Sequence, residues 1–180
     1  ENWTDKEKIT ANAFSPHFVY NQVARFKDSD CGTGGAHFSH ALRLIMEQGV
    51  CKRNTFNLSA DRCDVMPKES QKIDADKYRI KDYLQLFKSK DLEKVKIRRI
   101  RESLNNDIPV IVGMKLDDTF MDIKPGDKYW KPSPDSKKEE NHAMIVVGYH
   151  AVKKEFELMN SWGSDWGDEG FLKVKYKDFA

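Results

Sequence analysis

The sequence lacks several features that mark particular classes of protein. No apolar run approaches the roughly 18 residues that a membrane-spanning helix needs, and residues 1–20 lack the basic and then apolar build of a secretory signal. The 31 basic and 29 acidic residues are interleaved and leave a net charge of only +2. Because no broad field of one sign results, we expect neither a membrane nor a nucleic acid as partner.

Cysteine is scarce, with only Cys31, Cys51 and Cys63. Their spacing matches neither a zinc pattern nor a Cys-x-x-Cys redox pair, and we predict no metal and no cofactor. An odd number leaves at least one cysteine without a partner in this chain. In an oxidising compartment that count indicates a bridge to a cysteine outside these residues, whereas in the cytosol all three would be buried thiols.

The first half of the sequence reads as helical. With 39% hydrophobic and 33% charged residues, 180 residues can bury one sizeable core or two small ones. Ser15-Pro16 predicts the start of a helix of about three turns, with one apolar face formed by Phe18, Val19, Val23 and Phe26. A second helix is predicted from Phe38 until Gly49 stops it, with Phe38, Ala41, Leu42, Ile45 and Met46 on one face.

The middle of the sequence is less regular. Residues 51–76 predict a loop with one short helix, and Tyr78 to Phe87 predict a linking strand. A third helix is predicted from Asp91 to Leu104. Its basic run, Lys94 to Arg101, has apolar residues at roughly helical spacing, so a solvated helix face is favoured over a nucleic-acid patch.

The second half consists of short apolar runs rich in β-branched residues, which predict a β-sheet or barrel. These runs are Pro109 to Met114, His142 to Tyr149, Phe156 to Met159 and Phe171 to Tyr176. Pro125 to Glu140 has the composition of an exposed loop. We therefore predict an α+β fold with the helices first and the strands second.

Two polar motifs lie at the ends of predicted strands. Asn141-His142-Ala143 opens one strand, and the run Asn160-Ser161-Trp162-Gly163-Ser164-Asp165-Trp166-Gly167 follows the next. A histidine alone at a strand start is usually structural, but the second motif changes that reading. Together the two runs resemble the histidine and asparagine motifs of papain and the cathepsins. Cys31 to Gly35 also resembles the Cys-Asn-Gly-Gly turn of that family, in a longer form more similar to bacterial members.

The resemblance covers nearly the whole chain and implies a papain-like two-lobed fold. Residues 1–87 would form the remainder of the helical lobe with its glycine-rich turn and linker. Residues 88–180 would form an antiparallel β-barrel-like lobe that carries the histidine and the asparagine. Because relatives extend beyond the matched motifs, we expect the fold to be incomplete at both ends.

The resemblance also implies a role for each catalytic residue. His142 would act as general base and acid in an ion pair with a thiolate, and Asn160 would hold the imidazole in the productive tautomer through its side-chain oxygen. Trp162 would shield that hydrogen bond from water and border the leaving-group side of the cleft.

Substrate-binding residues follow from the same resemblance. Gly34 and Gly35 would offer backbone hydrogen bonds to an extended peptide, and Ala143 would line the main specificity pocket. A simple helix-entry turn is the alternative for Gly34-Gly35. For Trp166 we favour core packing.

The nucleophile of the family is missing from this sequence. No Cys-Gly-Ser/Ala-Cys-Trp/Tyr motif occurs, and no cysteine precedes Cys31. Cys31 lacks a following aromatic residue and resembles a family cysteine that forms a disulfide to a partner just after the nucleophile, so we expect its partner outside this stretch. The oxyanion-hole glutamine is also absent, because Gln22 belongs to a later helix. The nucleophile is expected before Glu1.

Three hypotheses follow. The first is a cysteine endopeptidase that acts on a peptide or protein substrate, with a companion segment or chain supplying the catalytic cysteine. The second is a catalytically inactive papain-like domain that binds peptides. The third is another Cys-His enzyme, such as an amidase or a transferase. By family, a secreted, periplasmic or lysosome-like compartment is favoured over the cytosol.

Overall fold

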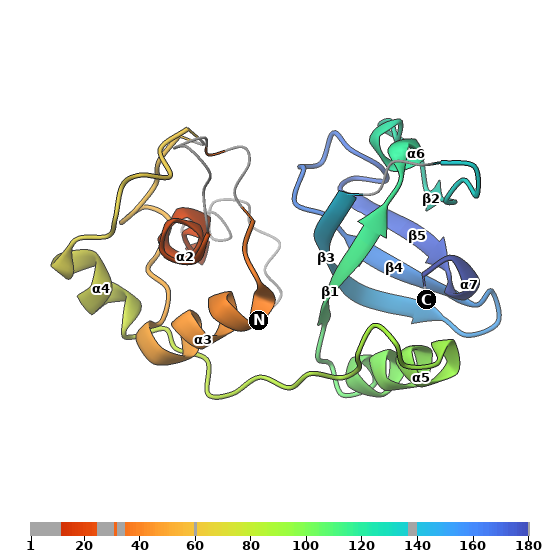
Figure 1. Ribbon diagram of the computed structural model, residues 1–180, viewed down its shortest axis with the longest axis horizontal. Helices are drawn as coiled ribbons and strands as arrows, with labels where there is room; N and C mark the ends of the chain where they lie inside the picture. The colour runs from red at the N-terminus through yellow and green to blue at the C-terminus, as the bar shows by residue number, and fades with distance from the viewer. Residues whose placement is uncertain (1–11, 25–30, 32–34, 60, 137–139, 180) are drawn as a thin grey trace. The chain divides into compact units, whose positions relative to one another are not determined.

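The computed structural model describes residues 12–24, 31, 35–59, 61–136 and 140–179. The chain divides into two compact units, Glu1–Leu84 and Gln85–Ala180 (Figure 1). From the sequence we placed this boundary after residue 87. Each unit has its own cluster of buried apolar side chains, so each is described by itself. No helix in the described part of the chain is long and apolar enough to cross a bilayer.

The first unit begins with α2, Pro16–Val23, whose start follows the prediction. The Ser15 hydroxyl accepts a hydrogen bond from the Phe18 N–H at 3.1 Å and donates one to the Phe56 carbonyl oxygen. The helix is shorter than the predicted three turns, because Ala24 already has extended backbone angles. Phe26, which we placed on its apolar face, lies outside the described residues.

Helix α3, Phe38–Gln48, contacts α2 and ends where Gly49 adopts a φ of +80°. A Cβ atom at Gly49 would lie only 1.8 Å from the Ala75 carbonyl oxygen, so this helix end requires glycine. The predicted apolar face is partly wrong. Leu44 is the residue that α3 buries and Ile45 packs against the same cluster, whereas Phe38 at the start of the helix is 40% exposed.

The remainder of the first unit corrects one prediction. The short helix expected within residues 51–76 is present as α4, Glu69–Ala75. The linking strand expected from Tyr78 to Phe87 is absent, since these residues form bends and irregular backbone and pair with no strand among the described residues. Extended backbone becomes a strand only where a second strand supplies its hydrogen bonds, which sequence patterning does not reveal.

The second unit consists of a sheet with helices packed against it (Figure 1). Its described strands follow the order β1-β3-β4-β5-β2. All neighbours are antiparallel except β2 and β5, which pair in parallel over two residues. In chain order the elements are α5 Glu93–Leu104, β1 Val110–Leu116, α6 Asp118–Met121, β2 Tyr129–Trp130, β3 Glu140–His150, β4 Glu155–Met159, β5 Phe171–Lys175 and α7 Tyr176–Phe179.

The fold is α+β as predicted, but the sheet is open within the described residues and does not close into a barrel. Alternate residues of β1 point into the core, and α5 contacts β1 and β3 through the buried Ile100. The segment from Pro125 to Glu140, predicted as a loop, contains the short strand β2. Its Trp130 is buried, because it packs edge-on against Phe120.

Candidate active site

The sheet brings His142 and Asn160 to the same end of two neighbouring strands. His142 lies near the start of β3, and Asn160 directly follows β4. Because β3 and β4 are antiparallel, the start of one lies beside the end of the other. The Nε2 atom of His142 and the Oδ1 atom of Asn160 are 2.8 Å apart, a hydrogen-bond distance.

The direction of this hydrogen bond follows from a second contact of Asn160. Its Oδ1 atom also accepts a hydrogen bond from the Ser161 backbone N–H at 2.8 Å. A backbone N–H can only donate, so the atom that faces the imidazole is the amide oxygen and not the nitrogen. Nε2 of His142 therefore donates, and the neutral ring carries its proton on Nε2. Nδ1 is left as the nitrogen that can exchange a proton.

A cluster of aromatic rings surrounds the histidine. The centroid of the Trp162 indole lies 4.9 Å from that of the His142 ring, and Phe120 contacts both rings, at 6.0 Å from His142 and 5.5 Å from Trp162. Phe120 is fully buried, while Trp162 is 42% exposed. The imidazole is thus held between a buried ring and an indole that reaches the surface, which lowers the local dielectric around its hydrogen bond.

The turn after Asn160 depends on glycines. Gly163, Gly167 and Gly170 all have positive φ, and a Cβ atom at Gly167 would lie 2.6 Å from the Phe171 carbonyl oxygen. The Asn160 N–H donates to the Gly170 carbonyl oxygen at 3.0 Å, which closes the turn. The glycines of this motif thus fix the position of the asparagine backbone.

A family model described as papain family cysteine protease matches residues 18–179. The chain belongs to the papain family of cysteine proteases. The match spans both units, so the helical half and the sheet are parts of one family domain. The resemblance inferred from the two motifs is confirmed.

Several relatives and solved structures are similar to this papain-family chain. An uncharacterized peptidase C1-like protein of Acanthamoeba polyphaga mimivirus is 26% identical over 94% of this chain and 56% of its own length. Procathepsin L of Felis catus is 41% identical over 32% of this chain and 18% of its own. Xylellain, a cysteine protease from Xylella fastidiosa, superposes with a TM-score of 0.73 at 21% identity, over 91% of this chain and 64% of its own. The chain thus spans about half the length of the viral relative.

A small hollow of about 80 Å³ lies beside the histidine of this papain-family chain, lined partly by Asp118, Asn141, His142 and Trp162. The neighbouring Asp117 accepts hydrogen bonds from the Thr119 hydroxyl and from the Ser133 N–H. Burial alone would raise the pKa of Asp117, but these hydrogen bonds outweigh it and hold the pKa below its usual value.

Asp117, which no sequence motif marks, helps to fix the aromatic cluster. Thr119, which donates to Asp117, accepts a hydrogen bond from the indole Nε1 of Trp130 at 3.0 Å. An Asp-x-Thr pattern is too common for its sequence to signal this contact. Trp166, for which we favoured core packing, is buried against Phe120 and Trp162.

The predicted substrate-binding residues lie in both units. Ala143 and Trp162 are exposed in the second unit, next to His142 and Asn160. Gly35 is exposed in the first unit, and Gly34 lies outside the described residues. A Cβ atom at Gly35 would meet no described atom within 4 Å, and Gly35 does not have the positive φ that would require glycine. No described neighbour therefore accounts for glycine at this position.

The cysteines of this papain-family chain correct one expectation. Cys31 forms a disulfide with Cys63, at a Cα–Cα distance of 5.6 Å, so its partner lies within the chain and not outside it. The spacing gave no sign of this, because residues 32 positions apart meet only through the fold. Cys51 is the odd cysteine left over, and it is fully buried. Burial, with a contribution from Asp74, raises the pKa of its thiol to about 11.

Proposed function

We propose that this chain supplies the histidine and asparagine of a papain-like cysteine endopeptidase that hydrolyses peptide bonds by a Cys-His-Asn mechanism. The observation that carries the proposal is the hydrogen bond from His142 Nε2 to Asn160 Oδ1 under the Trp162 indole. It leaves Nδ1 of His142 as the acid and base, and gives the ring a fixed orientation.

The nucleophile comes from a cysteine other than the three in this sequence. Cys31 and Cys63 are joined to each other, so neither offers a thiolate. Cys51 is buried, and with a thiol pKa of about 11 it stays protonated at neutral pH. A companion segment or chain carrying a cysteine would complete the site.

In the proposed reaction the thiolate attacks the carbonyl carbon of the scissile peptide bond. The imidazolium of His142 gives its Nδ1 proton to the leaving amine nitrogen, and the C–N bond breaks to leave an acyl-enzyme. Nδ1 then takes a proton from a water molecule whose oxygen attacks the thioester carbon. The carboxylic acid leaves, and the thiolate and imidazolium are restored.

The substrate is an extended peptide. Ala143, beside the histidine, would line its specificity pocket, and Trp162 would border the leaving-group side. At Gly34-Gly35 the peptide backbone would approach closely, and it is consistent with this role that no described atom lies within 4 Å of a Cβ placed on Gly35. The disulfide favours an oxidising compartment, such as a secreted or lysosome-like one, over the cytosol.

The test is peptide hydrolysis by the native protein that contains this sequence. Loss of a positioned general acid and base costs about 10²–10⁴-fold in rate. His142→Ala should therefore lower kcat/KM by about 10²-fold or more. Asn160→Ala should cost less, since the asparagine orients the ring but transfers no proton.

The matched control is His150→Ala, at the exposed far end of the same strand. This variant should keep its activity within about twofold, since it removes an exposed side chain whose hydrogen bond, from the Lys153 N–H, lies in the turn after β3. Equal hydrolysis by the His142→Ala protein would refute the proposal. A native protein without hydrolytic activity that still binds peptides would favour a catalytically inactive papain-like domain.

A further inference from the structure

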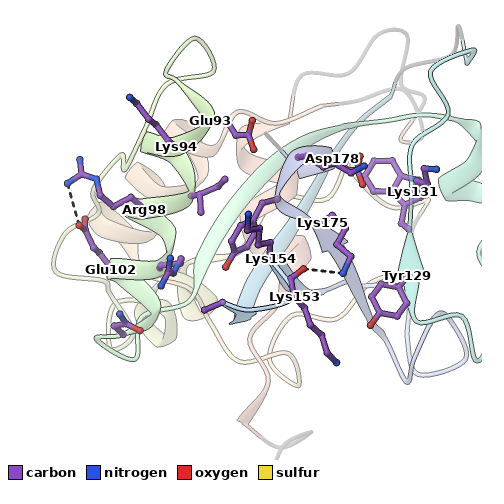
Figure 2. Close-up of a pocket in the computed structure, with 17 residues that line it drawn as sticks. Glu93, Lys94, Arg98, Glu102, Tyr129, Lys131, Lys153, Lys154, Lys175 and Asp178 are labelled. Atoms are coloured by element: carbon purple, nitrogen blue, oxygen red, sulfur yellow. Dashed lines mark hydrogen bonds and ion pairs between the residues drawn. The ribbon is translucent and has the colours of Figure 1, made fainter.

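A large groove lies on the second unit, apart from the histidine and asparagine. It has a volume of about 1150 Å³ and is bounded by α5, β2, α7 and the turn between β3 and β4. Figure 2 shows residues that line it, with Lys94 and Arg98 on α5, Tyr129 in β2 and Lys131 directly after it, and Lys153, Lys154 and Lys175 between them. Neither His142 nor Asn160 lines it.

The groove is basic. Its lining contains eight lysine and arginine residues against three aspartate and glutamate residues. Two of the cations already have carboxylate partners, since Arg98 lies 3.5 Å from Glu102 and Lys175 lies 2.7 Å from the buried Glu155. Lys94, Lys131 and Lys154 have no carboxylate within ion-pair distance among the described residues. An excess of positive charge is therefore left for a ligand.

Two polar groups in the lining have donors without acceptors. Tyr176 is only 7% exposed, and its hydroxyl has no hydrogen-bond partner in the described part of the chain. The Nε atom of Arg101 is also buried and has no hydrogen-bond partner among the described residues. The guanidinium carbon of Arg101 lies 4.8 Å from the Tyr149 ring centroid. Buried donors without acceptors are rare and unfavourable in folded proteins. Both atoms are enclosed, so a carboxylate that entered the groove and displaced the side chains covering them would satisfy both.

The remaining lining residues favour a peptide over a polyanion as the ligand of this groove. Ile97, Ala151 and the half-exposed Tyr129 give the groove apolar surface, which an evenly charged ligand would leave unused. Glu93 and Asp178 line the groove as well and would repel a uniform run of phosphates. We propose that this groove binds an acidic polypeptide segment with interspersed apolar residues, and that one of its carboxylates accepts hydrogen bonds from Tyr176 and Arg101.

The test uses the full 180-residue chain and a rhodamine-labelled decapeptide of alternating glutamate and leucine, followed by fluorescence anisotropy. A lysine and leucine decapeptide and a ten-residue oligothymidylate serve as comparison probes. Lys131→Glu with Lys154→Glu should weaken binding of the acidic peptide about tenfold or more, because two attractions become repulsions. Tyr176→Phe, which removes only a hydroxyl, should weaken it about tenfold.

The matched control is Lys124→Glu, the same charge reversal at an exposed lysine outside the groove, which should change the affinity less than twofold. Unchanged affinity in the double variant, or tighter binding of the oligothymidylate than of the acidic peptide, would overturn the proposal. The measurement involves no hydrolysis, so its failure would leave the proposed peptidase function untouched.

Discussion

The orientation of the His142 ring depends on a single amide side chain. Oδ1 of Asn160 accepts from both the imidazole and the Ser161 N–H, while its Nδ2 is buried and has no partner among the described residues. The asparagine thus uses its oxygen to position the histidine and leaves its amide nitrogen unsatisfied. Such an arrangement is costly for stability and is typical of a side chain retained for a function.

We predict that Asn160→Ala changes the tautomer of the neutral His142 ring. With the acceptor gone, the proton should no longer be confined to Nε2, and the ¹⁵N chemical shifts of the two ring nitrogens should move toward each other. A long-range ¹H–¹⁵N spectrum of the labelled chain measures both. The shifts of His150 serve as the internal control, and identical His142 shifts in both proteins would contradict the assignment.

Cys51 should be inert in the folded chain. Its thiol is buried with a pKa of about 11, so a thiol reagent such as Ellman's should titrate no cysteine in the folded 180-residue chain by itself at pH 8 and one after unfolding without reductant. Reduction of the disulfide in denaturant should make all three cysteines reactive. Reaction of a cysteine in the native chain would contradict this account.

The raised pKa of the Cys51 thiol leads us to expect that the stability of the chain depends on pH. Above about pH 8.5 the unfolded thiol loses its proton, while the folded one keeps it up to about pH 11. The unfolded state therefore binds fewer protons, and the free energy of unfolding falls as the pH rises through this window, by up to about 1.4 kcal/mol per pH unit. The free energies of unfolding of the wild-type and Cys51→Ala proteins are measured by chemical denaturation at a series of pH values. Plotted against pH, the two should have different slopes in this window and the same slope below about pH 8.

At the scale of single elements, α2 depends on its first residue. Ser15 is buried, caps α2 and donates to the Phe56 carbonyl oxygen, so it ties the helix to the loop that follows α3. Ser15→Ala should destabilise the chain by about 1–3 kcal/mol, since it removes the cap and leaves a buried carbonyl without that donor. Chemical denaturation measures the loss.

Two variants control for this effect. Ser15→Thr keeps the hydroxyl and should recover most of the stability, and Ser89→Ala, at an exposed serine, should cost less than about 0.5 kcal/mol. A Ser15→Ala protein as stable as the Ser89→Ala protein would show that the cap contributes nothing.

An element could be predicted from the sequence where residues close to it in the sequence determine it. The start of α2, the end of α3 at Gly49 and the strands that carry His142 and Asn160 follow from neighbouring residues, and the structure has them where we expected. Pairing is not local. The segment from Tyr78 to Phe87 has a strand-like composition and finds no partner, whereas Tyr129–Trp130 lies in a loop-like sequence and pairs with β5.

The same distinction applies to the candidate site. The two motifs predicted His142, Asn160 and Trp162, because each is marked by its own neighbours in the sequence. Asp117 and Thr119, which support the aromatic cluster through Trp130, carry no such mark. The Cys31–Cys63 disulfide also required the fold, since a count of three cysteines is compatible with any pairing or with none.

At the scale of the whole molecule, the chain belongs to the papain family, yet its own cysteines are unsuited to the family's chemistry. Two are joined in a disulfide and the third is a buried thiol. The histidine and asparagine, by contrast, are held in a hydrogen bond with a defined proton position. These two facts together motivate the central claim, that this chain provides the acid and base of a peptidase whose nucleophile lies elsewhere.

The most direct test is to treat the native protein with a thiol-reactive epoxide inhibitor of cysteine peptidases, and to locate any adduct by mass spectrometry with fragmentation. We predict one adduct, on a cysteine outside these 180 residues, with its yield abolished by His142→Ala and unaffected by His150→Ala. An adduct on Cys31, Cys51 or Cys63, or no adduct at all, would contradict the claim.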